Sequence, residues 1–246
     1  MRYQIIDEIR GITLVSMILY HGIWDLVYIF GWNLSWFQTQ GAYLWQQSVC
    51  WMFILLSGFC WSLGKQKLKR GLVVFGAGIL VSVVTIFIMP GERIVFGILT
   101  FLGSCMLFMI PMEKLLKRIK SEIGILGCLV LFFVFRNVNR GYLGADGIFS
   151  MELPQKWYQN YLTAYFGFPE KSFFSTDYFS VFPWIFLFMT GYFLYQFLKE
   201  KEVLEKTLNL KIRFYVFEIL GKKSLLVYLC HQPIIYLVLM VANEVW

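Results

Sequence analysis

The run Asp7-Glu8-Ile9-Arg10-Gly11, continued after eight mostly apolar residues by Tyr20-His21-Gly22-Ile23-Trp24-Asp25, decides how this chain is interpreted. It places an Arg, a His and two Asp in a segment that is otherwise typical of a membrane-spanning helix. Ionisable groups inside a hydrophobic span are costly, and by default they mark a functional site. We therefore expect the rest of the chain to form the setting for these polar residues.

Helical geometry places three of these residues on one face. Arg10 and His21 are eleven residues apart, close to three whole turns, which is roughly 16 Å along the axis. Asp25 follows His21 by four residues and shares that face. A carboxylate there can fix the imidazole tautomer and stabilise the imidazolium, as a general base requires. Two alternatives stay open: Asp25 could bind another helix, and a buried His is often only a hydrogen-bonded packing residue.

Arg10 allows two compatible interpretations. As a topology anchor, its side chain would snorkel to the membrane interface. As a ligand, its guanidinium would hold a phosphate or carboxylate at the cytoplasmic mouth of the helix. Asp7 lies one turn earlier and could pair with Arg10 and hold it in place.

The composition indicates a membrane protein. The 246 residues are 59% hydrophobic, 20% aromatic and only 15% charged, with long apolar runs separated by short basic segments. This pattern is typical of a polytopic membrane protein and argues against a soluble domain with a large core. The net charge of +7 does not indicate nucleic-acid binding, because the basic residues lie between the spans. The five Cys show no CxxC or Cys/His metal spacing, so neither a disulfide framework nor a metal site is expected.

The hydropathy pattern predicts an all-α, polytopic membrane helix bundle with about seven transmembrane helices, forming a single domain over residues 1–246. The predicted spans are about 9–30, 42–63, 71–89, 94–112, 121–138, 178–198 and 224–243. The longest connection, about 139–176, is rich in Gly, Pro and aromatic residues. It is too aromatic for a disordered linker, so we expect an ordered loop with short interfacial helices.

The distribution of basic residues predicts the orientation. The N-terminal tail and the connections after the second, fourth and sixth spans hold 17 of the 22 Lys and Arg. Cytoplasmic loops are the ones rich in Lys and Arg. The N-terminus is therefore expected in the cytoplasm, the C-terminus outside, and the 139–176 loop at the outer face.

Polar residues also occur near the last two spans. Asp177 precedes the sixth span, where it could cap a helix or contact a substrate at the outer face. The last span contains His231-Gln232-Pro233, and the sixth contains Phe182-Pro183-Trp184. A proline inside a helix frees a backbone carbonyl and kinks the helix, which a membrane tolerates where polar partners or a cavity satisfy it. We expect a cavity between the first, sixth and seventh spans.

At these residues the sequence resembles the heparan-alpha-glucosaminide N-acetyltransferase catalytic-domain family, in its shorter bacterial form, within the wider group of integral-membrane sugar acyltransferases. The resemblance is carried by Asp7-x-x-Arg10-Gly11 with His21 and Asp25, and by motifs that follow in order along residues 7–240. These are Phe53 to Phe59, Phe96-Gly97-Ile98-Leu99, Asp177-Tyr178-Phe179 through Trp184, and Gly221 with Ser224 to Pro233.

The resemblance implies an acyl-CoA-dependent membrane N- or O-acetyltransferase. It would move an acyl group, acetyl in the first instance, from cytoplasmic acyl-CoA to an amino or hydroxyl group of a sugar or cell-envelope glycan at the outer face. His21 would be the base with Asp25 in support, and Arg10 with Asp7 would lie near the CoA entrance. The acceptor cavity would be lined by Asp177, Trp184, His231 and Gln232. No metal and no nucleic acid are implied, and oligomerisation is left open.

The sequence is also compatible with two other classes of function. A transporter or translocator of a small or lipid-linked substrate would also need polar groups and kinked helices near the middle of the membrane. A catalytically silent assembly subunit is a third alternative, suggested by the short length. The chain also departs from the family pattern at Thr100, where bacterial relatives often have His. The expected location is the bacterial plasma membrane, with several passes through the bilayer.

Overall fold

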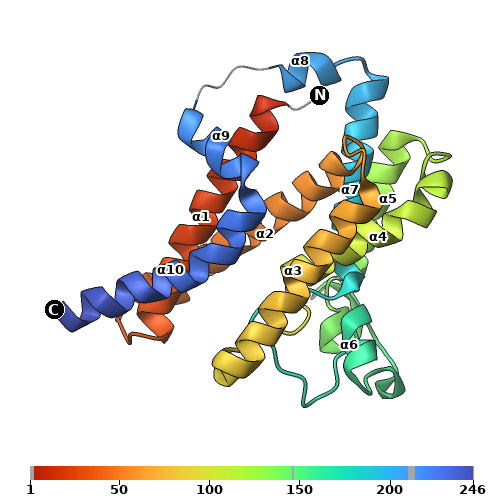
Figure 1. The fold of residues 1–246 in the computed structure, drawn as a ribbon. Coiled ribbons are helices and arrows are strands. Elements are labelled where there is room, and N and C mark those ends of the chain that lie inside the picture. Colours follow the sequence, from red (N-terminus) through yellow and green to blue (C-terminus); the bar gives the residue numbers. More distant parts are fainter. Residues whose placement is uncertain (1–2, 146, 210–213, 246) are drawn as a thin grey trace. The chain divides into compact units, whose positions relative to one another are not determined.

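The computed structural model describes residues 3–145, 147–209 and 214–245, and nearly all of its secondary structure is helical (Figure 1). The long helices are α1 (Gln4–Tyr28), α2 (Gln40–Trp61), α3 (Lys67–Ile88), α4 (Ile98–Leu116), α5 (Ser121–Phe135), α7 (Val181–Glu200) and α10 (Ser224–Val245). The two ends of each helix lie within about five residues of the two ends of the corresponding predicted span. The prediction of an all-α membrane protein is confirmed.

Six of the described helices are long and apolar enough to cross a membrane, against the seven or so predicted. The helix that falls short is α2, although it has 22 residues. Its adjacent Gln46 and Gln47 lower the hydropathy of a helix that carries no formal charge. The length and composition of a helix do not determine its direction across the membrane, so the predicted orientation stays a prediction. Arg2, Lys211 and Arg213, which were counted for it, lie outside the described residues.

The remaining elements are short. They are the 3-10 helices η1 (Ser35–Gln38), η2 (Pro90–Glu92), η3 (Val138–Arg140) and η4 (Gln155–Trp157), the strands β1 (Tyr142–Ala145) and β2 (Phe149–Glu152), and the helices α6 (Tyr161–Phe166), α8 (Leu204–Leu208) and α9 (Tyr215–Lys222). Strands β1 and β2 form an antiparallel hairpin in which Tyr142 lies opposite Glu152. The connection predicted as an ordered loop therefore contains the expected short helices and a hairpin that was not predicted.

The chain divides into two compact units. The first comprises residues Met1–Leu56 and Glu202–Trp246, and the second comprises Ser57–Lys201, so α2 runs across the boundary. In the first unit, α1 packs against α9 and α10. Leu14 and Met17 of α1 form a buried cluster there with Val49 of α2. The prediction of a single domain stays a prediction.

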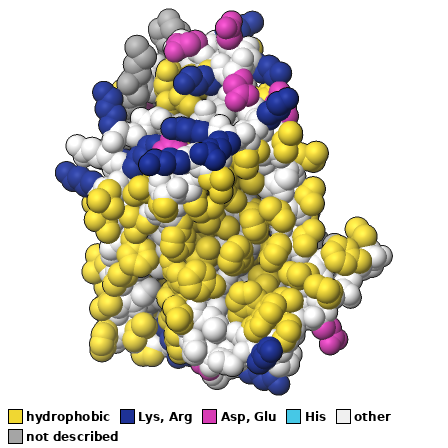
Figure 2. Space-filling view, turned by 90° about the vertical axis from the view of Figure 1, so that its right-hand side faces the viewer, with side chains coloured by type: hydrophobic (Ala, Val, Ile, Leu, Met, Phe, Trp, Pro, Cys, Tyr) yellow, Lys and Arg dark blue, Asp and Glu magenta, His cyan; other side chains and the backbone are white. Residues whose placement is uncertain are grey.

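In the second unit, α3 packs on α4 and α5 packs on α7. The outer surface of α3 is apolar, and Phe87 near its end is 81% exposed. On the face shown in Figure 2, hydrophobic side chains cover the middle, while Lys and Arg gather mainly towards the upper end. Lipid covers such a surface in a membrane, which removes the cost that the same surface would have in water.

The two predicted helix breaks differ in position. Pro233 lies inside α10, as expected. In α7 the backbone leaves the helical conformation at Phe182, with φ −90° and ψ 135°, one residue before Pro183. A proline disfavours the helical region for the residue before it, and at Phe182 the resulting break falls at the start of α7 rather than within it.

Candidate functional site

The site begins where α1 crosses α9. A Cβ atom on Gly11 would lie 2.0 Å from the carbonyl oxygen of Phe217 in α9, and a Cβ atom on Gly221 would lie 1.8 Å from the carbonyl oxygen of Asp7 in α1. Both distances are shorter than any real contact. Only glycine lets the two backbones approach so closely. Two glycines of the motifs therefore fix this crossing at the start of α1.

The predicted pair of Asp7 and Arg10 is present at this crossing. The Arg10 Nη1 atom lies 3.3 Å from Asp7 Oδ1, and the Asp7 side chain is buried while that of Arg10 is 24% exposed. Nearby, Gln4 Nε2 donates to Glu218 Oε2 over 2.8 Å, and Lys222 forms an ion pair with the same Glu218. Arg10 is thus oriented by a buried carboxylate, and part of its guanidinium stays accessible.

Glu8 is a buried polar residue that was not among the predicted site residues. It is only 2% exposed, and among the described residues its Oε2 atom has no hydrogen-bond partner. Sequence alone offered one signal, since Glu8 stands beside Asp7 at the start of an apolar helix. A buried acceptor without a donor is costly, so Glu8 belongs with the functional candidates.

Two histidines far apart in the sequence lie side by side. The ring centroids of His21 in α1 and His231 in α10 are 5.1 Å apart, with 60° between the ring planes. His21 is partly buried beside Tyr20, and its ring nitrogens have no hydrogen bond within the described part of the chain. A neutral imidazole has one nitrogen that accepts and one that donates. His21 is therefore free to exchange a proton with a bound molecule.

The tautomer of His231 follows from its one hydrogen bond within the described residues. Its Nδ1 atom contacts the carbonyl oxygen of Tyr228, one turn earlier in α10. A carbonyl oxygen can only accept, so Nδ1 carries the proton and Nε2 is left as an acceptor. His231 Nε2 is buried and has no partner among the residues that the structure describes. It therefore offers an unsatisfied acceptor next to His21.

Asp25 binds α10 rather than His21. Its side chain is fully buried, and Gln232 Nε2 donates to both carboxylate oxygens, over 2.7 Å to Oδ1 and 2.9 Å to Oδ2. This is the alternative in which Asp25 pairs with another helix. The amide of Gln232 is thereby oriented, and its Oε1 atom is a second buried acceptor without a partner in the described chain. The first unit thus brings together four of the predicted residues: His21, Asp25, His231 and Gln232.

Asp177 lies in the second unit, where it caps a helix other than the expected one. Its Oδ2 atom accepts from the N–H of Ile98, the first residue of α4, over 3.2 Å. Carboxylates stabilise helix N-termini in this way. Burial nevertheless raises the pKa of the Asp177 carboxyl to about 6, because the hydrogen bond from Ile98 offsets only part of the desolvation.

The same contact joins two motifs that carried the resemblance. Ser175 Oγ accepts from the N–H of Val95 over 2.9 Å, and the N–H of Phe179 donates to the carbonyl of Phe96 over 2.9 Å. The segment before α7 is therefore fixed alongside the segment before α4. These contacts give Asp177 a structural role, and the prediction that it binds substrate stays a prediction.

Trp184 also lies in the second unit and is only 7% exposed. Its ring packs against Phe179 and Phe132, with centroids 5.0 and 5.4 Å away, and the Arg136 guanidinium lies 4.7 Å from the ring centroid. These contacts account for the tryptophan as a core residue, and the predicted substrate contact stays a prediction.

Thr100 is buried as well, and its Oγ1 has no partner in the described chain.

Six membrane-length helices, together with buried polar side chains on α1 and α10, define a multi-pass membrane protein. The model of the family described as heparan-alpha-glucosaminide N-acetyltransferase, catalytic, matches residues 2–233. The chain therefore belongs to this family, as its motifs predicted. Membership of this family indicates a membrane acetyltransferase, and the co-substrate of the family in general is acetyl-CoA. No curated protein and no solved structure matched the chain.

Proposed function

We propose that this protein is a bacterial plasma-membrane acyltransferase that moves an acetyl group from cytoplasmic acyl-CoA to an amino or hydroxyl group of a cell-envelope sugar or glycan at the outer face. The observation that carries the proposal is the group of buried acceptors on α10, His231 Nε2 and Gln232 Oε1, beside the partly buried His21. Buried acceptors without donors are costly, and a substrate with N–H or O–H groups would satisfy them.

In this proposal His21 is the general base. An accepting ring nitrogen of His21 takes the proton from the acceptor's amino or hydroxyl group as that group bonds to the acyl carbon. The proton then passes to the departing thiolate. His231 Nε2 and Gln232 Oε1 hold the acceptor's remaining hydrogens, and Asp25 keeps the Gln232 amide oriented through its two hydrogen bonds. General base catalysis by a positioned side chain contributes typically about 10²–10⁴-fold.

The residues at the α1–α9 crossing fit a phosphate-bearing co-substrate. Arg10 is held by Asp7 through one nitrogen, which leaves further guanidinium donors in a partly exposed side chain. Arg10 would bind phosphate groups of acyl-CoA, and Asp7 would orient Arg10. The acyl-CoA supplies the activated acetyl group. Among the described residues, no group of three or more His, Cys, Asp or Glu is arranged to hold a metal ion, and the proposal includes none.

The test compares His21→Ala with Leu19→Ala in the purified protein. Leu19 lies on the same helix and is 56% exposed, so its truncation controls for changes to α1. Thiol release from acetyl-CoA and acetyl mass added to isolated cell-envelope glycan are measured together. We expect His21→Ala to lose at least about 100-fold in rate, with unchanged expression, and Leu19→Ala to keep its activity. Retained activity in His21→Ala would remove His21 from the mechanism.

A further inference from the structure

A cavity of about 450 Å³ lies in the second unit, formed by the connection between α5 and α7. This volume is within the range of small-molecule sites, about 300–1,000 Å³. Its walls come from η3, η4 and the segment that leads from α6 to α7. None of its lining residues belongs to the proposed acetyl-transfer site.

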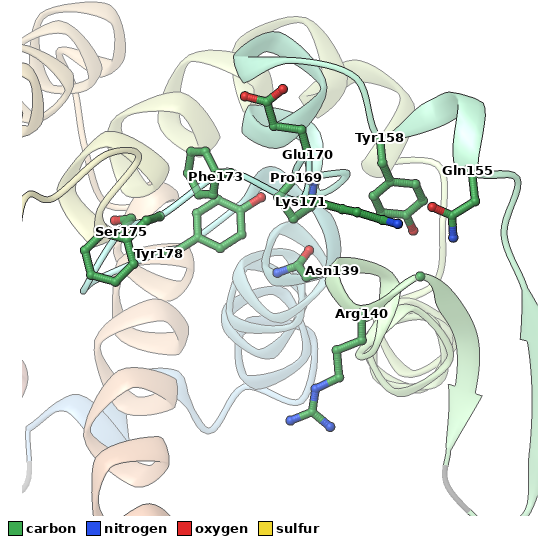
Figure 3. Close-up of a pocket in the computed structure, with 12 residues that line it drawn as sticks. Asn139, Arg140, Gln155, Tyr158, Pro169, Glu170, Lys171, Phe173, Ser175 and Tyr178 are labelled. Carbon is green, nitrogen blue, oxygen red and sulfur yellow. The ribbon is translucent and has the colours of Figure 1, made fainter.

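The cavity has two chemically different ends (Figure 3). At one end lie the aromatic rings of Phe173 and Tyr178. At the other, the amine of Lys171 points towards Tyr158 and Gln155, while the carboxylate of Glu170 points away from them. A ligand that fits both ends needs an apolar face and a polar, negatively charged part.

The aromatic walls are held in place by their own contacts. Phe173 stacks on Phe96 with 10° between the ring planes, and the ring of Tyr178 lies 4.8 Å from that of Phe173. The hydroxyl of Tyr178 donates to the carbonyl of Ala164, and the hydroxyl of Tyr158 donates to that of Val138 over 2.6 Å. Walls that are fixed before binding reduce the entropic cost of binding.

The cationic groups at the cavity are not used by the described part of the chain. Arg140 and Lys171 are both exposed, and among the described residues neither takes part in an ion pair or a side-chain hydrogen bond. Other cations are paired, such as Lys67 with Glu113 over 2.6 Å. The Nδ2 atom of Asn139 adds a neutral donor, since the hydrogen bond of that side chain uses its oxygen. Cations and amide donors around an open cavity favour a carboxylate or phosphate.

We propose that this cavity is a binding site for a sugar unit that carries an anionic group. The sugar ring would lie against Phe173 and Tyr178, and its carboxylate or phosphate would bind the amine of Lys171. The guanidinium of Arg140 points away from that amine (Figure 3) and would add to the positive charge at the rim of the cavity. Both parts are required, because the rings suit the C–H face of a sugar and the cations suit the charge. The site binds without reacting, so it can be tested apart from acetyl transfer.

The test is isothermal titration calorimetry on the full-length protein in detergent. The probes are glucuronate and glucose 6-phosphate, with glucose and inorganic phosphate as the matched partial ligands. We expect each charged sugar to bind at least about tenfold more tightly than glucose or phosphate, as expected when a charge-assisted hydrogen bond is added. Raised salt should weaken the charged sugars and leave glucose unchanged.

Two variants with the same charge change locate the site. Lys171→Gln should weaken glucuronate binding about tenfold, whereas Lys156→Gln, on the same connection but outside the cavity, should leave it unchanged. Lys171→Arg should retain binding. Thermal unfolding of each variant shows whether it is folded, and Arg140→Gln provides a second variant if Lys171→Gln unfolds. Equal affinity for glucose and glucuronate, phosphate binding as tightly as the charged sugars, no saturable binding, or equal losses in both Gln variants would overturn the proposal.

Discussion

The hydrogen bonds between Asp25 and Gln232 are a buried, charge-assisted link between α1 and α10. Removing one partner of a buried hydrogen bond to a carboxylate costs about 1.5–3 kcal/mol, because the carboxylate loses a donor while it stays buried. We expect Gln232→Leu to lower the free energy of unfolding by about 1.5–3 kcal/mol. The double variant Asp25→Leu with Gln232→Leu should recover part of that loss, since no charge is then left buried. Denaturant unfolding in detergent of the parent protein, both single variants and the double variant measures the coupling.

A coupling free energy below about 0.5 kcal/mol, the usual value for independent sites, would show that these two side chains do not stabilise each other. Asp25→Asn provides an internal control, because it keeps the shape of the side chain and removes only its charge. The helix contacts are then conserved, so its loss of stability should be smaller than that of Gln232→Leu.

Local spacing predicted the site only where both partners share one helix. Asp7 and Arg10 are three residues apart, and the pair is present. The contact between His21 and His231 joins two different helices, and no helical period predicts which helices become neighbours. For Asp25 the sequence allowed two partners, His21 or a residue of another helix. Asp25 accepts hydrogen bonds from Gln232 in α10, because a fully buried carboxylate needs hydrogen-bond donors.

At the scale of elements, the crossing of α1 and α9 depends on Gly11. A methyl group there would meet the Phe217 carbonyl at 2.0 Å, whereas on Gly22 of the same helix the nearest atom would be 3.9 Å away. Gly11→Ala should therefore move the helices apart and lower the unfolding free energy by about 1–3 kcal/mol. Gly22→Ala should leave it unchanged or raise it, because alanine is the better helix former. Thermal unfolding of the two variants compares them directly.

The cap on α4 should make stability depend on pH. Burial raises the pKa of Asp177 from 3.8 to about 6, so the folded protein holds this proton more tightly than the unfolded chain. Stability should therefore fall as pH rises from about 4 to about 6 and change no further above that, as linkage requires. In Asp177→Asn the side chain cannot ionise, yet its oxygen can still accept from Ile98. Melting temperatures of the two proteins, measured from about pH 4.5 to 8, should run parallel only above about pH 6.

If the two melting curves were parallel over the whole pH range, Asp177 would not titrate in that window. Glu170→Gln is a suitable control, because it makes the same change from carboxyl to amide on the same connection without altering the cap on α4.

The long helices were predictable because a long apolar segment in a membrane must satisfy its backbone hydrogen bonds internally, and a helix does so within one segment. The connection between α5 and α7 was not, since its short strands depend on contacts that a four-residue pattern does not encode. Tyr142 pairs with Glu152 across a turn, and the segment before α7 is fixed by backbone groups near Val95, 80 residues earlier. Links between residues so far apart in the chain cannot be predicted from a local sequence pattern.

At the scale of the whole molecule, the side of the membrane on which the N-terminus lies depends on whether α2 crosses the bilayer. The basic connections after α2, α4 and α7 belong on the cytoplasmic side whether or not α2 crosses. If α2 crosses, the N-terminus is also cytoplasmic, and Arg10 faces the compartment that contains acyl-CoA. If α2 does not cross, the start of α1 lies outside. The adjacent Gln46 and Gln47 make α2 less apolar than the membrane-length helices, but they carry no charge to prevent insertion.

A cysteine placed between α1 and α2 separates these two topologies. In a cysteine-free variant of the protein, Asn33→Cys, which is exposed, would be labelled in intact cells by a membrane-impermeant thiol reagent only if α2 crosses. Lys156→Cys should be labelled and Glu205→Cys protected in either case, so they calibrate the two sides. We expect Asn33→Cys to be labelled, because this places all the strongly basic segments inside together with Arg10. Protection of Asn33→Cys would put Arg10 on the outer side, and the donor could then not be bound there from the cytoplasm.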